Sequence, residues 1–164
     1  MRCIGIDIGS SSIKGGVLDT RTGRVEHIAK TAFPEPIAGL PAGFHEVQPE
    51  AVLDGARDVV LALLRHAPDA RQLRVSSQMG GVLLLDDRGR PLTRYMSWRD
   101  QRTLRPEPAA GDAGARTSLE ALRAAWSDEY FAQLGKELKP GSTTALLHWL
   151  AHRGGLPAGA TPVT

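Results

Sequence analysis

The N-terminal part of the chain alternates apolar and polar residues with a period of two, which is the pattern of β-strands. Residues 2–8 place their isoleucines on one face, and the alternation returns in residues 13–19 and in residues 25–32. Polar, glycine-containing turns separate these runs at residues 9–12 and 19–23. The pattern therefore predicts a three-stranded antiparallel meander at the start of the chain.

A helical period replaces the strand period after a proline-rich loop at residues 33–46. Pro49 at the first helical position and Glu50 in the first turn mark the start of a helix, which we expect to end near residue 66. The apolar positions that recur at helical spacing are Val52, Ala56, Val59 and Leu63, supported by Leu53, Val60 and Leu64.

Short strand-like runs follow this helix. Residues 73–76 form one, and residues 82–85 form a second that is apolar throughout, as expected of a strand buried on both faces. A turn at residues 86–89 and a returning segment at residues 91–97 complete a hairpin. The order of elements is that of an α/β protein, without the strict βαβ alternation of a doubly wound nucleotide-binding fold.

Helices dominate the C-terminal part. Thr117 and Glu120 have the spacing of a capping box, which predicts a helix start. We expect a further helical turn that stops near Gly135 and a last helix at residues 142–154, capped by its serine and ended by its glycine. The tail at residues 155–164 is expected to have no element of its own.

Composition narrows the class of protein without identifying a function. The 164 residues suit one domain, 41% of them are hydrophobic, and the net charge is only +2. This charge does not suggest a nucleic-acid partner, and the apolar runs are too short for a membrane span. The single cysteine, Cys3, lies in an apolar run, which favours a buried structural thiol. We therefore expect a cytoplasmic protein.

Residues 5–14 carry the clearest chemistry of the chain. A carboxylate at the end of a strand can hold Mg²⁺ through its water shell, and a glycine lets the backbone approach phosphate oxygens closely. Serine hydroxyls, backbone amides and a lysine can then bind the phosphate. The candidates are Asp7 for the metal and Gly9, Ser10, Ser11, Ser12 and Lys14 for the phosphate.

Two other interpretations of this segment were considered. A polar hairpin turn without a ligand explains the Gly-Ser-Ser-Ser run by itself. Ser11 and Lys14 match the Ser-x-x-Lys of β-lactamases, but the later motifs of that family are absent from the sequence. No Gly-x-Gly-x-x-Gly and no Walker A sequence occurs. The position between two apolar strands near the N-terminus favours the phosphate site.

Three segments, in this order, resemble the N-terminal domain of the FGGY carbohydrate kinases, the group of xylulokinase, gluconokinase and glycerol kinase. Residues 4–19 resemble the first phosphate motif of that family, and residues 45–50 resemble the segment that opens its first helix. Residues 75–102 resemble its xylulokinase-type segment, which runs from Ser-Gly-Gln-Met-His-Gly through a strand and a hairpin to Trp-x-Asp-x-Arg. The resemblance covers nearly the whole chain and weakens at residues 103–141.

The resemblance implies a ribonuclease-H-like, actin-like ATPase fold with a mixed sheet flanked by helices. Residues 1–164 would form the N-terminal part of the first kinase domain, with a flexible linker at about residues 105–116 and no C-terminal domain. It also implies Mg²⁺ and ATP as cofactors and a sugar or polyol as substrate. Asp7 would take the catalytic metal role. Ser10, Ser11, Ser12 and Lys14 would take the phosphate contacts.

The two sugar-side segments of the family also have counterparts here. An indole face can pack on the apolar face of a polyol, while a carboxylate and a guanidinium bind its hydroxyls. A ligand role is favoured for Trp98, whereas core packing explains Met79 equally well. By resemblance, the sugar-binding residues are Gln78, Met79, Gly80, Trp98, Asp100 and Arg102.

Two departures from the family pattern affect the expected function. Gly80 stands where the xylulokinase-type motif has histidine, which removes a hydrogen-bonding side chain and puts D-xylulose itself in doubt. The catalytic Asp of a late Gly-Asp motif has no counterpart, since the only such pair, Gly111-Asp112, lies in the expected linker. We therefore expect the chain alone to be inactive and to need the missing kinase portion or self-association.

These observations leave two classes of function. The first is enzymatic, with the chain as part of an FGGY-type kinase that phosphorylates a sugar or polyol hydroxyl. The second is a non-catalytic actin-like module that binds a ligand or a partner chain.

Overall fold

The computed structural model describes residues 1–106 and 116–164. The chain divides into two units. The first unit combines Met1–Glu35 with Gln48–Gln78, and the second combines Pro36–Val47 with Met79–Thr164. The expected linker at about residues 105–116 falls largely outside the described residues, and Gly111-Asp112 lies outside them entirely.

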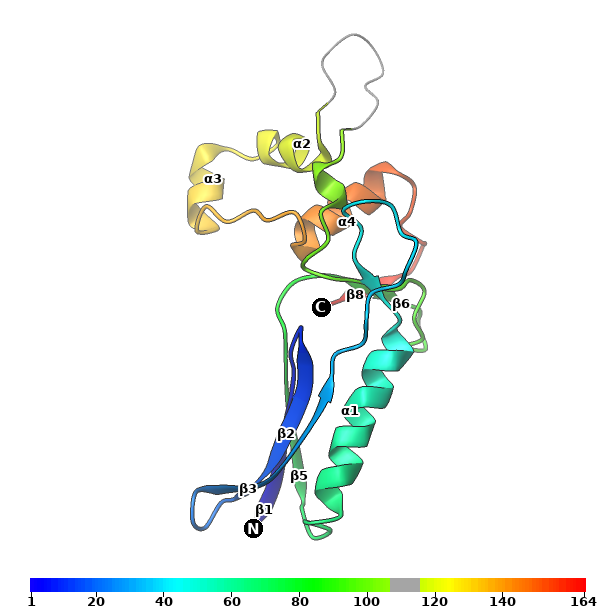
Figure 1. The fold of residues 1–164 in the computed structure, drawn as a ribbon. Helices are drawn as coiled ribbons and strands as arrows, with labels where there is room; N and C mark the ends of the chain where they lie inside the picture. The colour runs from blue at the N-terminus through cyan, green and yellow to red at the C-terminus, as the bar shows by residue number, and fades with distance from the viewer. Residues whose placement is uncertain (107–115) are drawn as a thin grey trace. The chain divides into compact units, whose positions relative to one another are not determined.

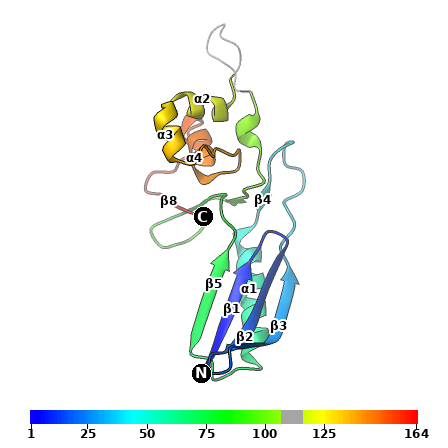
Figure 2. The ribbon, with the colours of Figure 1, turned by 90° about the vertical axis from the view of Figure 1, so that its left-hand side faces the viewer.

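The first unit is built on a four-stranded mixed sheet with the order β3-β2-β1-β5. Its strands are β1 (Arg2–Ile8), β2 (Ser12–Asp19), β3 (Arg24–Ala32) and β5 (Gln72–Ser77). The first three pair antiparallel, as the alternating pattern predicts, and β5 pairs parallel with β1 (Figure 2). The parallel pair requires the chain to cross over through helix α1 (Pro49–Leu64).

Helix α1 packs its apolar stripe on one face of this sheet (Figure 1). Val59 and Leu63 of the helix are 2% and 1% exposed, and they meet the inward side chains of β1 and β2. Leu53 is 65% exposed, so the expectation that it supports the buried stripe was wrong. Leu53 follows half-buried Val52 in the helix. Because one step along a helix turns the side chain by about 100°, Leu53 lies outside the buried stripe.

Beneath the helix, the backbones of β1 and β2 approach closely. A β-carbon on Gly15 would lie 2.6 Å from the carbonyl oxygen of Gly5 and 3.0 Å from Leu63 Cδ1. The pairing of β2 with β3 shifts register between Gly15 and Val17, which marks a bulge. Cys3 is buried, as expected, and its thiol donates to the Ile4 carbonyl over 3.6 Å.

Short strands and a hairpin organise part of the second unit. Strand β4 (Glu46–Val47) pairs with β7 (Tyr95–Met96), and β6 (Leu83–Leu85) pairs with β8 (Thr161–Val163). The tail therefore has an element, contrary to expectation. The expectation that residues 82–85 are buried on both faces was also wrong, because only alternate residues are buried and Leu83 and Leu85 are half-buried.

Two helices of the second unit begin where the sequence predicts. The capping box of Thr117 and Glu120 opens α2, and the Ser142 side chain caps α4. The bounds are η1 (Arg102–Leu104), α2 (Ser118–Ala124), α3 (Asp128–Gln133) and α4 (Thr143–His152). The core of this unit consists of Val82, Leu84, Met96, Leu146 and Leu150.

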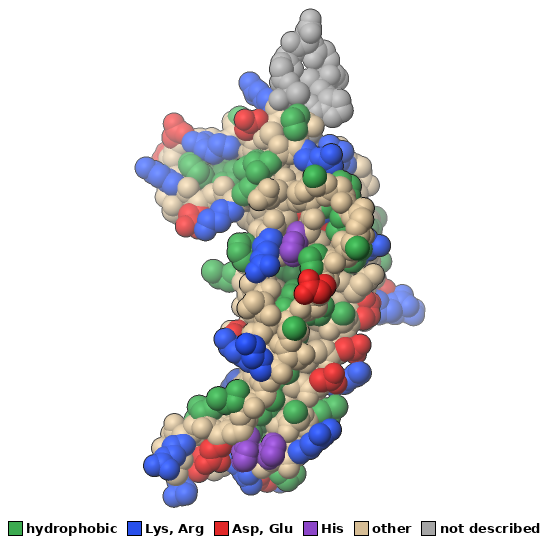
Figure 3. All heavy atoms as spheres, viewed as in Figure 1, with side chains coloured by type: hydrophobic (Ala, Val, Ile, Leu, Met, Phe, Trp, Pro, Cys, Tyr) green, Lys and Arg blue, Asp and Glu red, His purple; other side chains and the backbone are tan. Residues whose placement is uncertain are grey.

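Charged side chains of both signs lie on the surface of the described residues. On the face seen in Figure 3, Lys and Arg side chains lie interspersed with Asp and Glu. Among the described residues, no helix combines the length and the apolar character that crossing a bilayer requires.

Candidate functional site

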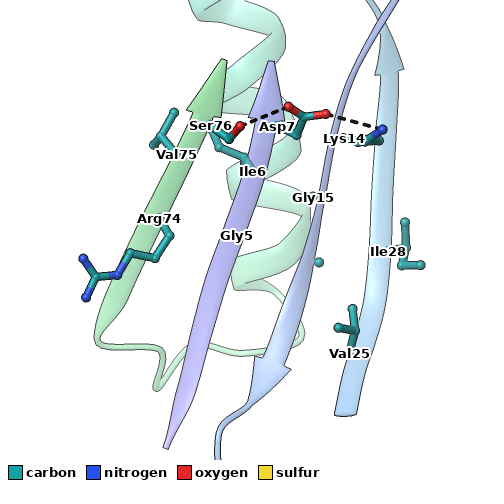
Figure 4. Close-up of a pocket in the computed structure, with 11 residues that line it drawn as sticks. Gly5, Ile6, Asp7, Lys14, Gly15, Val25, Ile28, Arg74, Val75 and Ser76 are labelled. Atoms are coloured by element: carbon teal, nitrogen blue, oxygen red, sulfur yellow. Dashed lines mark hydrogen bonds and ion pairs between the residues drawn. The ribbon is translucent and has the colours of Figure 1, made fainter. Parts of the chain in front are cut away.

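Three polar side chains meet near the C-terminal end of β1. Asp7 is the partner of Lys14 in the antiparallel register with β2 and of Ser76 in the parallel register with β5. Registered residues point to the same face of a sheet, so all three face away from α1 (Figure 4). Lys14 Nζ lies 3.4 Å from Asp7 Oδ2, and the Ser76 hydroxyl donates to Asp7 Oδ1 over 3.4 Å.

The Asp7 and Lys14 side chains remain accessible, with 42% and 57% of their surfaces exposed. An ion pair this exposed is screened by water and contributes between 0 and about 1 kcal/mol. The Asp7–Lys14 ion pair can therefore be broken at little cost in free energy when a metal ion binds Asp7 or a phosphate binds Lys14. Within residues 1–106 and 116–164, no group of three acidic, histidine or cysteine side chains could hold a metal by itself. The donor set fits Mg²⁺ that keeps most of its waters.

The turn after β1 is tight. The Gly9 amide donates to the Ser12 carbonyl over 3.0 Å, and a β-carbon on Gly9 would lie 3.1 Å from that oxygen. Ser11 is exposed and Ser10 is half-buried, whereas Ser12 is only 8% exposed. Of the three candidate serines, Ser10 and Ser11 are therefore the ones positioned near solvent.

A pocket of about 470 Å³ lies on the same open face of the sheet, beside Asp7 and Lys14. Gly5 and Gly16 are partners across β1 and β2, and because neither has a side chain, the bottom of the pocket stays open. The pocket is lined by Gly5, Ile6, Asp7, Lys14, Gly15, Gly16, Val25, Ile28, Arg74, Val75 and Ser76.

The sugar-side candidates do not all fall in one unit. Gln78 is the last residue of the first unit, and its backbone amide donates to the Ile8 carbonyl over 3.0 Å. Met79 and Gly80 begin the second unit, which also holds Trp98 and the two charged candidates.

The backbone after Met79 is fixed by three hydrogen bonds within the second unit. Tyr95 Oη donates to the Gly80 carbonyl over 3.1 Å, and the Gly81 amide donates to the Gly141 carbonyl over 2.9 Å. The Thr143 hydroxyl donates to the Gly81 carbonyl over 2.8 Å. Gly80 and Gly81 have φ values of +86° and +80°, a conformation that favours glycine.

This loop lies directly against the segment that carries Trp98. A β-carbon on Gly141 would overlap the Trp98 carbonyl group, and one on Gly80 would lie 3.1 Å from Trp98 Cβ. The Met79 side chain, just before this loop, is 89% exposed, and Trp98 is 44% exposed. The core-packing interpretation of Met79 was therefore wrong, because its side chain lies in solvent.

Asp100 is buried with all its acceptor positions engaged. Its carboxylate is 0% exposed and accepts from the His45 amide at 2.7 Å and the Arg102 amide at 2.8 Å. It also accepts from Arg102 Nε at 2.9 Å and from Arg102 Nη2 at 2.8 Å. A sugar hydroxyl could reach this carboxylate only by displacing one of these bonds.

Arg102 is held equally firmly. It is 3% exposed, donates to Glu46 Oε1 over 2.6 Å, and lies 4.2 Å from the Phe44 ring and 5.0 Å from the Trp149 ring. Burial alone would lower the pKa of Arg102, but the hydrogen bonds to Asp100 and Glu46 raise it. Sequence reasoning gave no role to these three neighbours of Arg102, which come from distant parts of the chain.

Sequence reasoning gave no site role to Arg99 and His45, which lie near residues 97 and 98 in the structure. The Arg99 guanidinium lies 5.5 Å from the centroid of the Trp98 ring, a cation–π distance. The His45 carbonyl accepts from the Ser97 amide over 2.9 Å. Burial and the positive charge of Arg99 lower the pKa of His45, against a smaller opposing effect of Asp100. The imidazole is therefore neutral near pH 7.

Sequence comparison finds relatives among carbohydrate kinases. A family model described as "FGGY family of carbohydrate kinases, N-terminal domain" matches residues 2–154. The chain is 30% identical over 105 residues to the xylulose kinase of Staphylococcus xylosus. This alignment covers 61% of this chain and 20% of that protein. It is 28% identical over 151 residues to the gluconokinase of Bacillus subtilis (strain 168). This second alignment covers 91% of this chain and 27% of that protein.

A solved structure has the same fold. The glycerol kinase of Plasmodium falciparum, determined with ADP, matches 99% of this chain and 32% of its own with a TM-score of 0.77 and 15% identity. At this identity the likeness shows the fold alone, and it confirms the expected ribonuclease-H-like, actin-like ATPase fold. The chain spans 20% to 27% of the length of the two curated relatives.

Proposed function

The chain belongs to the FGGY family of carbohydrate kinases, and we propose that it carries the phosphate-binding motif and part of the sugar site of such an enzyme. The complete enzyme transfers the terminal phosphoryl group of ATP to a hydroxyl of a sugar or polyol. Membership of this family does not favour the alternative, a non-catalytic actin-like module.

The observation that carries this proposal is the ion pair of Asp7 and Lys14 on the open face of the sheet (Figure 4). The Gly9–Ser12 turn lies between these two residues in the chain. Asp7 would be the residue that holds Mg²⁺, and Lys14 and the turn would bind phosphate oxygens. Bound Mg²⁺ supplies positive charge to the transferring phosphate group. The exposure of both side chains makes them available to ligands, and their opposite charges suit the metal and the phosphate respectively.

On the sugar side, Trp98 and Met79 offer exposed apolar surface to the body of the substrate. We assign Asp100 and Arg102 a positioning role, because both are buried and bonded to each other. Their bonds to the His45 amide and to Glu46 tie the segment that follows Trp98 to residues 45 and 46. Their contribution to sugar binding is therefore indirect.

Steady-state kinetics of the complete enzyme, with ATP and sugar varied separately, tests the phosphate site. Because charge neutralisation matters most in the transition state, Asp7→Asn lowers kcat by about a hundredfold and changes the sugar KM much less. Asp54→Asn is the matched control, since Asp54 is an exposed carboxylate on α1 of the same unit. A near-normal kcat for Asp7→Asn would return residues 9–12 to the interpretation as a simple polar turn.

A further inference from the structure

Two histidine side chains of the first unit stack on each other at its surface. The rings of His27 and His66 are nearly parallel, with an angle of 7° between their planes and 4.2 Å between their centroids. Both residues are exposed, and neither belongs to the apolar core of the unit. The two lie far apart in the chain, so the fold brings them together.

The backbone holds both histidines in defined positions. His27 lies in β3 at the bulge, and its φ of +50° falls in the left-handed region that residues other than glycine seldom adopt. His66 follows the end of α1, where its amide donates to the Leu63 carbonyl over 3.0 Å and its carbonyl accepts from Arg2 Nη1 over 2.8 Å. An unusual backbone conformation that the surrounding structure maintains is typical of functional positions.

We propose that His27 and His66 together bind a divalent ion of a late transition metal, such as Zn²⁺. A neutral imidazole offers one nitrogen lone pair, and imidazole nitrogen suits Zn²⁺, Cu²⁺ and Ni²⁺ as a ligand. Zn–N bonds of about 2.0–2.1 Å place two tetrahedral nitrogen ligands roughly 3.3 Å apart. Small tilts of the two exposed rings therefore direct one nitrogen of each onto the same ion.

The site has two protein ligands, and water completes the coordination. Within residues 1–106 and 116–164, no group of three acidic, histidine or cysteine side chains could hold a metal. Once one imidazole has bound the ion, binding by the second is intramolecular, which raises the affinity above that of a single histidine. The ion links β3 to the end of α1. Its nitrogen ligands distinguish this site from Asp7, whose carboxylate suits Mg²⁺.

Histidine labelling of the complete protein tests the pair. Diethyl pyrocarbonate acylates the same nitrogen lone pair that binds a metal, and mass spectrometry reads each histidine separately. We expect Zn²⁺ to protect His27 and His66 over the same concentration range, while Mg²⁺ protects neither. In His27→Asn, the Zn²⁺ concentration that protects His66 rises about tenfold or more, and His66→Gln has the same effect on His27. Asparagine is chosen at position 27 because it also tolerates a positive φ.

His152→Gln is the matched control, since it removes an exposed histidine from the second unit and should leave the protection of His27 and His66 unchanged. Far-UV circular dichroism checks the fold of each variant, and the protection of the parent protein needs no variant. The inference is overturned if Zn²⁺ protects neither ring of the parent or protects the two at different concentrations. It is also overturned if His66 stays protected in His27→Asn. Kinase activity is not the readout, so the proposed function stands or fails separately.

Discussion

Two acid–base pairs, one in each unit, come from motifs that look equivalent in the sequence but differ in their surroundings. Asp7 and Lys14 are 42% and 57% exposed and meet at 3.4 Å, whereas Asp100 and Arg102 are 0% and 4% exposed and meet at 2.8 Å. The first pair can open for a ligand, while the second is closed by its own hydrogen bonds. Burial, rather than residue type, thus decides which pair is open to a ligand and which pair is closed.

The energetics of the two pairs differ for the same reason. An exposed pair contributes at most about 1 kcal/mol, because water solvates each charge almost as well as the partner does. Removing one member of a buried pair leaves the other charge unsolvated, which typically costs about 3–5 kcal/mol. The comparison therefore predicts large stability effects at Arg102 and small ones at Lys14.

The largest expected effect follows from removing the buried cation. Arg102→Ala leaves Asp100 and Glu46 without their shared partner and lowers the free energy of unfolding of the second unit by about 3–5 kcal/mol. All three tryptophans of the chain belong to this unit, so urea denaturation followed by tryptophan fluorescence reports on it.

Two variants serve as comparisons for Arg102→Ala. Arg88→Ala removes an exposed arginine from the same unit and should change stability by about 0.5 kcal/mol or less. Lys14→Ala removes the cation of the exposed pair and should cost at most about 1 kcal/mol in far-UV circular dichroism melts. Equal losses for Arg102→Ala and Lys14→Ala would remove the distinction between the two pairs.

A smaller effect tests the backbone that holds Trp98 beside the buried pair. A methyl group on Gly141 would overlap the Trp98 carbonyl, so Gly141→Ala forces the two segments apart and costs about 1–3 kcal/mol. In Gly155→Ala the nearest atom is the flexible Leu150 Cδ2 at 3.2 Å, and a cost of about 0.5 kcal/mol or less is expected. Urea denaturation of both variants, again followed by fluorescence, measures the difference, and indistinguishable midpoints would contradict the close approach.

The sequence predicts the exposed pair better than the buried one because the exposed pair is local. Asp7 and Lys14 lie on strands joined by one tight turn, so alternation and the turn residues are enough to place them together. The capping box of α2, the Ser142 cap of α4 and the end of α3 just before Gly135 are local in the same sense. Each of these features depends on side chains only a few residues apart.

The buried pair depends on contacts that no local pattern encodes. Arg102 reaches Glu46 across 56 residues, and its aromatic neighbours Phe44 and Trp149 come from opposite sides of it in the chain. The pairing of β6 with β8 was missed for the same reason. The motif Trp-x-Asp-x-Arg predicts a sugar-side segment, but the burial of Asp100 follows only from the assembly of these distant segments.

The smallest expected effect concerns His45, whose amide binds the buried pair while its ring lies near Arg99. The pKa of His45 is lowered in the folded protein from its ordinary value of 6.5, first by burial and then by Arg99. As the pH falls below 6.5, His45 takes up a proton in the unfolded chain but not yet in the folded protein, so stability decreases until the pH reaches the folded pKa.

The variant His45→Gln removes this proton uptake. We therefore expect the difference in unfolding free energy between the parent protein and His45→Gln to be constant above the ordinary pKa and to shift in favour of the variant below it. Urea denaturation at several pH values measures this difference, in which the other titrating groups cancel, and a difference that stays flat across the window would show that His45 titrates as it does in the unfolded chain.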